Sequence, residues 1–318
     1  MKYIKYFLIF LALLIVAVIV FTYTDSKPKK AKKNPYEYNV DEFKKVDPEL
    51  ISHSETRQFK IKTGEHGALA THGGKIYFAG NQQLSVISPG GEMIRQFPVQ
   101  ANVRALDVDD NNIVLVYRSA YQLIDHKGKV IYDFNVKSDS SVFTSVAFWN
   151  DRIMVADAGT RKIYAFERGK ISSTVISEIE GVSGAKNLHG FIIPSPYFEL
   201  AVNNEDELWA TNPGMHALQQ YDLNGNLLDS WDKASMEIEG FTGCCNPAQF
   251  TFMADGRFVT SEKGMPRIKI YRADGSLESV VAPPSAFAGE KAPEIATLGE
   301  SIVALDFDQQ MIRIFEAK

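Results

Sequence analysis

The chain has 318 residues, of which 45% are hydrophobic and 23% are charged. This composition is that of a folded protein rather than a disordered one, and the length suffices for one large repeat domain or two ordinary domains. Beyond residue 33 the chain holds 27 Lys and Arg against 38 Asp and Glu, a net charge of −11. Such an acidic surface repels phosphate backbones, so we expect no nucleic-acid partner.

The chain begins with an uncharged, almost wholly apolar run from Tyr6 to Tyr23. Its 18 residues reach the lower limit for a membrane-spanning helix. No pair of small residues follows the run as a cleavage site, and no Cys offers a lipid attachment point. We therefore expect a transmembrane anchor at residues 1–24, with a cleaved signal peptide as the alternative.

Residues 25–54 are expected to form a basic and polar linker. Five lysines follow the apolar run and two precede it, and by the positive-inside rule alone this distribution would leave the C-terminal domain in the cytoplasm. The short basic tail, the single apolar segment and the long following domain nevertheless resemble an uncleaved export signal. We expect an extracytoplasmic domain on the periplasmic side, and the cytoplasmic orientation stays open.

From residue 66 onward one pattern recurs, in which short apolar strands alternate with polar turns. Its clearest part is a hairpin centred on a glycine turn, as in LQQYDLNGNLLDSW (218–231) and IKIYRADGSLESVV (268–281). Asn-Gly and Asp-Gly between alternating runs predict hairpins, because the turn requires a positive φ. The matching glycines are Gly91, Gly128, Gly169, Gly225 and Gly275.

The whole unit contains four strands and occurs six times. Equivalent residues lie 37, 42, 55, 50 and 44 positions apart, at Ile87, Ile124, Phe166, Tyr221, Tyr271 and Phe315. Four strands in about 40 to 45 residues is typical of propeller blades. The sixth copy has only three strands, and ETRQFKIK (55–62) matches the missing fourth. We expect this N-terminal segment to pair with residues 311–316 and close an all-β, six-bladed β-propeller over residues 55–318.

The segment VADAGTRKIYAF (155–166) resembles the strand-loop-strand motif of NHL repeats. The resemblance extends over most of residues 55–318 and implies an NHL-like propeller, with Asp157 and Arg161 paired in the loop. NHL propellers include binding scaffolds and enzymes such as the zinc-dependent amidating lyases. This chain lacks the several histidines of those lyases, so their catalytic residues cannot be transferred to it.

Two long insertions, at residues 179–197 and 233–248, precede blades four and five. In a four-stranded antiparallel blade these connections lie on the same face as the loops between strands two and three. Long loops in a compact repeat are common sites of function. We expect the apolar part of the first insertion, GFIIPSPYF, to cover the channel mouth as a plug, or alternatively to present Phe191, Tyr197 and Phe198 to a partner.

The insertions and the neighbouring loops bring polar residues of blades four and five to one rim. A charged wall there would recognise an anionic or zwitterionic ligand, since Arg binds carboxylates in a bidentate manner. A solvated loop with local ion pairs is the alternative. The candidate ligand-binding residues are Tyr197, Asn212, Glu262, Lys263 and Arg267.

Both cysteines of the chain, Cys244 and Cys245, are adjacent in the second insertion. They are candidates for a vicinal disulfide, for a pair that cycles between dithiol and disulfide, or for two inert small residues. They are also candidates for binding zinc or copper together with His189 or His216, although no CxxC or HExxH spacing is present.

No catalytic constellation is complete in the sequence. The first hypothesis is therefore a membrane-tethered module that binds a protein or small-molecule ligand through the face carrying residues 179–197 and 233–248. The alternative is a metal- or thiol-dependent enzyme, or a redox accessory protein, centred on Cys244 and Cys245.

Overall fold

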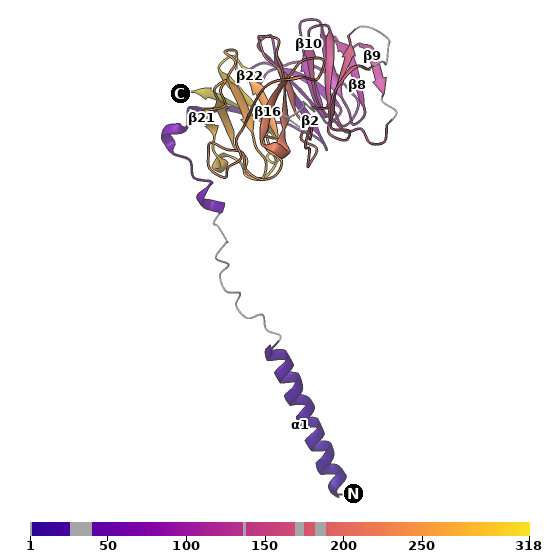
Figure 1. The fold of residues 1–318 in the computed structure, drawn as a ribbon, viewed down its shortest axis with the longest axis vertical. Helices are drawn as coiled ribbons and strands as arrows, with labels where there is room; N and C mark the ends of the chain where they lie inside the picture. Colours follow the sequence, from indigo (N-terminus) through magenta and orange to yellow (C-terminus); the bar gives the residue numbers. More distant parts are fainter. Residues whose placement is uncertain (1, 26–39, 136–137, 169–174, 182–188) are drawn as a thin grey trace. The chain divides into compact units, whose positions relative to one another are not determined.

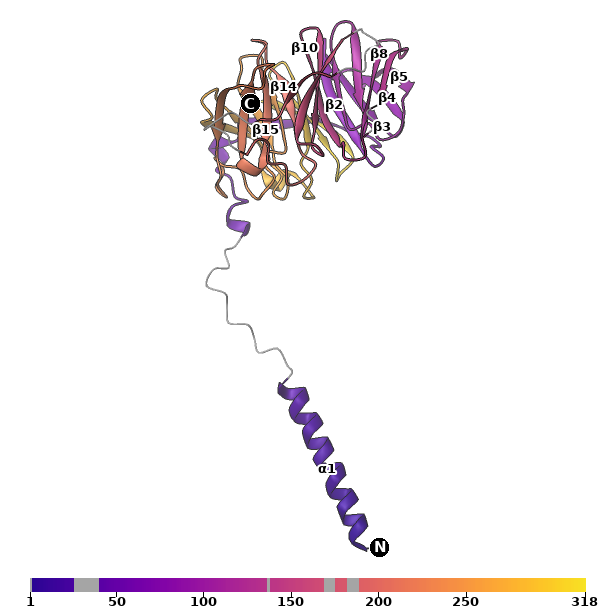
Figure 2. The same ribbon diagram turned by 45° about the vertical axis from the view of Figure 1, so that its right-hand side comes forward.

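The computed structural model describes residues 2–25, 40–135, 138–168, 175–181 and 189–318. It divides into two compact units, residues 1–40 and residues 41–318. Most of the expected linker, the turn at Gly169 and part of the first insertion lie outside the described residues. Figures 1 and 2 show the two units as ribbons.

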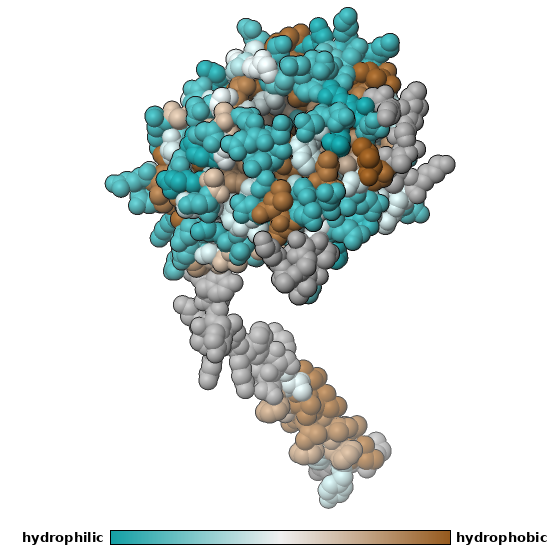
Figure 3. All heavy atoms as spheres, turned by 45° about the horizontal axis from the view of Figure 1, so that its top comes forward, coloured by the Kyte–Doolittle hydropathy of each residue, from teal (hydrophilic) through white to brown (hydrophobic). Residues whose placement is uncertain are grey.

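The first unit contains one helix, α1 (Lys2–Asp25). Its segment Tyr3–Thr22 has a mean hydropathy of 2.9 and no buried side chains, so it is long and apolar enough to cross a membrane. A signal sequence would have the same properties. Figure 3 shows the difference in surface character on the face in view, where α1 is mostly apolar and the propeller mostly hydrophilic.

The second unit is a six-bladed β-propeller, as the repeat predicts. Every blade is a four-stranded antiparallel sheet. Blades one to three consist of β2 (Gly67–His72), β3 (Lys75–Gly80), β4 (Gln83–Ile87) and β5 (Met93–Pro98), then β6 (Ala105–Val108), β7 (Asn112–Val116), β8 (Ala120–Asp125) and β9 (Val130–Asn135), then β10 (Phe143–Trp149), β11 (Arg152–Asp157), β12 (Lys162–Glu167) and β13 (Val175–Ile179).

Blades four and five follow the same order. They consist of β14 (Leu200–Val202), β15 (Leu208–Asn212), β16 (Ala217–Tyr221) and β17 (Leu227–Asp232), then β18 (Gln249–Phe252), β19 (Phe258–Ser261), β20 (Ile268–Tyr271) and β21 (Leu277–Ala282). Short 3-10 helices lie at Val40–Glu42, Pro48–Leu50, Pro213–Met215 and Pro284–Ala286.

Blade six confirms the predicted ring closure. It combines β22 (Glu294–Leu298), β23 (Ser301–Asp306) and β24 (Met311–Ala317) with the N-terminal strand β1 (His53–Lys60). β1 pairs antiparallel with β24, from His53 opposite Ala317 to Lys60 opposite Met311. The guanidinium of Arg313 donates from Nε to Glu55 across this pair, at 3.1 Å. β1 is therefore the outermost strand of blade six and covers the edge of β24 that would otherwise be unpaired.

The glycine turns also connect neighbouring blades. Gly91, Gly128 and Gly275 have φ values of +88°, +85° and +76°, which favour glycine. A Cβ at these positions would also collide with an aromatic ring from the outer strand of the preceding blade. The three rings belong to Phe59, Phe97 and Trp231. Glycine at these positions therefore meets two requirements, the positive φ of the turn and the close packing against the preceding blade.

Candidate functional site

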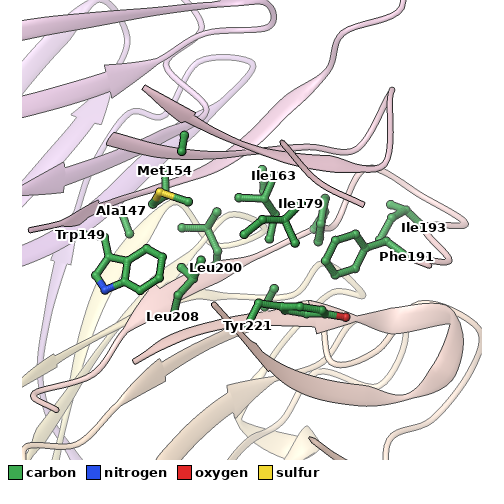
Figure 4. Close-up of a cluster of buried hydrophobic side chains, with 14 residues drawn as sticks. Ala147, Trp149, Met154, Ile163, Ile179, Phe191, Ile193, Leu200, Leu208 and Tyr221 are labelled. Atoms are coloured by element: carbon green, nitrogen blue, oxygen red, sulfur yellow. The ribbon is translucent and has the colours of Figure 1, made fainter. Parts of the chain in front are cut away.

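The first insertion packs into the core between blades three and four. Phe191 and Phe198 are 2% and 1% exposed, and their ring centroids lie 4.7 Å apart. Figure 4 shows Phe191 and Ile193 beside Ile179 and Tyr221, among core side chains of both blades. The expectation of a plug, and the alternative of presenting Phe191 and Phe198 to a partner, are therefore wrong, because the apolar side chains of this segment are buried between the blades.

Asn212 holds this insertion in place. Its Oδ1 accepts from the backbone N–H of Ile192 at 2.8 Å, and its Nδ2 donates to the Gly190 carbonyl at 3.0 Å. The same amide donates to Gln219 at 3.0 Å. Asn212 is fully buried, so its polar atoms are directed to the protein's own backbone and side chains rather than to the surface.

The second insertion is held by a buried ion cluster of Glu262, Arg267 and Lys269, all with exposed fractions of 0%. Glu262 Oε1 lies 2.7 Å from Arg267 Nε and 2.8 Å from Lys269 Nζ. Its Oε2 accepts from the backbone N–H of Thr242 at 2.9 Å. Both cations in turn donate to the Gly240 carbonyl, at 2.9 Å from Arg267 and 2.6 Å from Lys269.

This cluster contains one carboxylate and two cations, so its charges do not cancel. Burial acts to raise the pKa of Glu262, but the Lys269 and Arg267 charges outweigh it and hold the pKa below its ordinary value. Burial lowers the pKa of Lys269 to about 8, and the neighbouring Arg267 charge adds to this effect. Glu262 is therefore the ionised group on which the cluster depends.

Asn212 and Glu262 occupy equivalent positions, directly at the end of the second strand of their blades. Asp157 and Asp306 stand at the same position in blades three and six. The Asp157 carboxylate accepts from the backbone N–H groups of Val142 at 2.8 Å and Gly159 at 2.9 Å, rather than pairing with the Arg161 side chain. This position of the repeat therefore anchors adjacent loops and connections, which sequence analysis could have found by aligning the blades.

The two cysteines lie at the tip of the second insertion in unlike environments. Both are free thiols, with their Sγ atoms 3.2 Å apart. Cys244 is exposed, whereas Cys245 is only 3% exposed.

Asn246 fixes this tip to the blade-five loop. Its Nδ2 donates to the carbonyls of Thr242 at 2.6 Å and Lys263 at 3.0 Å. Its Oδ1 accepts from the backbone N–H of Lys263 at 2.9 Å. The cysteine tip and the Lys263 backbone are therefore held as one unit.

The Lys263 side chain connects both insertions. Its Nζ lies 5.3 Å from the ring centroid of Tyr197 in the first insertion, a distance typical of a cation–π contact. Burial raises the pKa of Tyr197, and the charges of Asp308 and Cys245 act in the same direction. The structure thus brings together four of the predicted residues: Tyr197, Cys244, Cys245 and Lys263.

Burial acts to raise the pKa of Cys245, but its surroundings outweigh this effect. The Ser195 hydroxyl, the Cys244 thiol and the Lys263 ammonium lower the pKa of Cys245 below its ordinary value. The pKa of Cys244 is raised, first by its hydrogen bond with Cys245 and then by the charge of Cys245. The buried thiol is therefore the better thiolate of the pair.

The two candidate histidines differ in position. The Nδ1 atom of His216 lies 3.2 Å from the Asn246 carbonyl, at the base of the cysteine tip. His189 is exposed. Within the described part of the chain, no group of three or more His, Cys, Asp or Glu residues converges in a metal-binding arrangement. The described residues therefore do not fit a four-ligand zinc site.

A second site was missed by sequence analysis. The innermost strands of all six blades line a central cavity of about 340 Å³, which includes residues of the turns after those strands such as Asn204, Ala254 and Gly299. It consequently opens on the face opposite the insertions.

Three carboxyl groups stand in or beside this central cavity. Burial raises the pKa of Glu199 to about 8 and that of Asp107 to about 6. Glu294 also has a raised pKa, through burial and the nearby Glu199. Glu199 accepts from the Ser145 hydroxyl, and Glu294 accepts from the Leu69 N–H at 3.0 Å. No cation opposes Glu199 in these contacts, so its neutral form is favoured near pH 7.

Comparison with solved structures places the fold among β-propellers. The chain is similar to a streptogramin B lyase, with a TM-score of 0.54 and 14% identity over 84% of this chain and 88% of that one. It is also similar to a catalytically inactive virginiamycin B lyase from Staphylococcus aureus solved with quinupristin, with a TM-score of 0.54 and 14% identity over 82% and 87%.

A protein of unknown function from Bacteroides thetaiotaomicron gives a TM-score of 0.60 at 13% identity, over 84% of this chain and 72% of that one. No family model matches the chain, and no curated protein matches it. At these identities the likeness concerns the fold alone, so membership of the NHL family stays a prediction.

Proposed function

We propose that this protein is a membrane-tethered β-propeller that binds a protein or small-molecule ligand through the face carrying the two insertions. A propeller supplies a rigid rim of loops, which suits a binding role. The observation that supports this face is the set of buried anchors beneath it. Asn212 and Glu262 hold the two insertions from within, so little conformational entropy is lost when a ligand binds there.

The chemistry of the face favours a ligand with an anionic or polar group. Lys263 can donate to such a group, while the Tyr197 ring supplies apolar area and a hydroxyl. Asn212, Glu262 and Arg267 would contribute indirectly, since their polar atoms hold the loops on which Tyr197 and Lys263 stand. The net charge of the propeller makes nucleic acid an unsuitable partner.

The proposal is tested by site-specific photocrosslinking with the full-length protein in its native membrane. A photoreactive residue replaces Pro196 or Ala234 on the insertion-bearing face, and matched controls replace Asn224 or Asp274 in hairpin turns of the opposite face. All four positions are exposed. We expect a discrete crosslinked product from the first pair. Products from the second pair alone would contradict the proposed face.

The proposed extracytoplasmic orientation needs its own test. In a Cys244→Ser, Cys245→Ser background, Asp274→Cys introduces one exposed thiol in a turn. A membrane-impermeant maleimide should label this thiol in intact cells whose outer barrier has been opened. Labelling only after the cytoplasmic membrane is disrupted would place the propeller in the cytoplasm.

A further inference from the structure

We propose that Cys244 and Cys245 form a thiol-oxidising site, whose disulfide accepts two electrons from a pair of thiols on a partner polypeptide. The exposed Cys244 sulfur receives the attacking thiolate, and the buried Cys245 sulfur departs. This activity goes beyond ligand binding, although it uses the same face. It rests on the spacing of the two sulfurs, their unequal exposure and the groups around Cys245.

The spacing permits a direct sulfur–sulfur bond. The two Sγ atoms lie 3.2 Å apart, and a disulfide requires about 2.05 Å. The movement needed is therefore about 1 Å. Because Asn246 fixes the chain on the C-terminal side of the pair, reduction and oxidation need not disturb the rest of the insertion.

The exposure of the sulfurs determines which one is attacked. Thiol–disulfide exchange needs access to the attacked sulfur, along the line of the bond that breaks. Cys244 is exposed and Cys245 is buried, so an incoming thiolate reaches Cys244. Cys245 then becomes the leaving thiolate.

The surroundings of Cys245 suit a leaving thiolate. The Lys263 ammonium acts on it with an opposite charge, and the Ser195 hydroxyl lies close enough to lower its pKa. The Ser195 hydroxyl oxygen is buried and has no hydrogen-bond partner among the described residues, so it is free to donate to a thiolate at Cys245. A thiol with a lower pKa leaves faster, and stabilising the reduced form makes a disulfide a stronger oxidant.

The exchange balances in two steps. A substrate thiolate attacks Cys244 Sγ, the Cys244–Cys245 bond breaks, and Cys245 holds the released electron pair as a thiolate. The second substrate thiolate then attacks the first substrate sulfur, which releases Cys244. The substrate gains one disulfide, and its two protons pass to Cys244 and to solvent, so the protein gains a thiol at Cys244 and a thiolate at Cys245. A disulfide compound regenerates the protein by the reverse exchange, and its own disulfide becomes two thiols.

The order of attack is tested by trapping with oxidised glutathione on the full-length protein. In Cys245→Ser the remaining exposed thiol should form a mixed disulfide with glutathione, seen as an added glutathione mass. In Cys244→Ser the buried thiol should react at least about tenfold more slowly, because its access is restricted. Equal rates, or a faster reaction of Cys244→Ser, would overturn the assignment.

The role of Lys263 is tested by equilibrium with glutathione redox buffers. Lys263→Gln should shift the wild-type pair toward the disulfide, by about tenfold if one pKa unit of thiolate stabilisation is lost. Lys263→Arg should restore most of the shift, and Lys129→Gln in a distant turn is the matched control. An unchanged equilibrium in Lys263→Gln would show that the lysine does not act on the leaving thiolate.

A dithiol peptide completes the test of activity. The oxidised wild-type protein should convert the peptide to its disulfide in equimolar amount, and the double variant Cys244→Ser, Cys245→Ser should not. The same double variant should keep the photocrosslinks of the insertion-bearing face. If the oxidised wild-type protein fails to oxidise the peptide but the crosslinks form, the redox site is refuted and the binding proposal stands. If the peptide is oxidised but no crosslinks form, the binding proposal is refuted and the redox site stands.

Discussion

Two carboxyl groups of this propeller, the fully buried Glu262 and the half-buried Glu199, respond to the loss of solvent in opposite ways. Glu262 remains ionised because Arg267 and Lys269 both lie within hydrogen-bonding distance. Glu199, in the central cavity, has a hydroxyl and a backbone N–H as its partners among the described residues, and its pKa rises to about 8. The first carboxylate fixes a loop through its charge, whereas the second is tolerated by holding a proton.

The largest effect is expected from Glu262→Gln. This change leaves Arg267 and Lys269 without their carboxylate, and breaking a buried ion pair in this way costs about 3–5 kcal/mol. Chemical denaturation at pH 7 measures the loss. Glu178→Gln is the matched control, because its pair with Lys162 is partly exposed and should contribute less than about 1 kcal/mol. Equal effects of the two changes would remove the distinction between anchor and surface pair.

Asn212→Ala should have the next largest effect. It leaves the Ile192 N–H and the Gly190 carbonyl without their partner, at a cost of about 1–3 kcal/mol. The loss should be smaller than for Glu262→Gln, because no charge is left unpaired. Limited proteolysis should additionally cut the first insertion faster. Unchanged stability and cleavage would mean that the core packing of Phe191 alone holds this segment.

The pH dependence separates the two kinds of carboxyl. Between about pH 4.5 and 8 the folded state keeps a proton on Glu199 that the unfolded state has released. The unfolded state therefore binds fewer protons, and stability falls as the pH rises through this window. Glu199→Gln should remove about 1–3 kcal/mol of this fall, measured as the difference between the two denaturation profiles. Parallel profiles would contradict a raised pKa.

The acid side has the opposite sign. The pKa of Glu262 is lowered in the folded state, so below its ordinary range the unfolded state binds more protons. Its contribution is present above that range and is lost as the pH falls through the folded value. Glu262→Gln should therefore flatten the acid limb of the profile while leaving the limb controlled by Glu199.

The smallest effect on stability is expected from Lys263→Gln. The side chain is only half-buried and its contact with Tyr197 is a single cation–π interaction. Its loss should change the free energy of unfolding by about 0.5–1 kcal/mol or less. A larger loss, measured by the same denaturation series, would make Lys263 a structural residue like Glu262 rather than part of the working surface.

The fold could be predicted because its local signals agree. The Asp-Gly and Asn-Gly turns at Gly275 and Gly225 specify hairpins, and their spacing specifies the blades. The ring closure could also be predicted, because the segment ending at Phe59 repeats the sequence pattern of the segment ending at Phe97. Both phenylalanines then cover a turn glycine of the following blade.

The site was predicted only in part. The proximity of its residues could be predicted from the sequence, but their burial could not. Topology alone placed Tyr197, Cys244, Cys245 and Lys263 near one another. It could not show that Glu262 and Arg267 lie beneath the second insertion, because a charged pair in a loop has the same sequence whether a neighbouring segment covers it or not. The central cavity was missed because Glu199 and Glu294 approach only when distant blades close the ring.

The two insertions are held in place by buried anchors at the ends of the second strands, Asn212 and Glu262. Hydrogen exchange of the native protein tests this directly at the backbone N–H groups of Ile192 and Thr242, which donate to Asn212 and Glu262. Both groups should be protected in the wild type, and each should lose protection only when its own anchor is substituted. Rapid exchange in the wild type, or protection that survives both substitutions, would contradict the account.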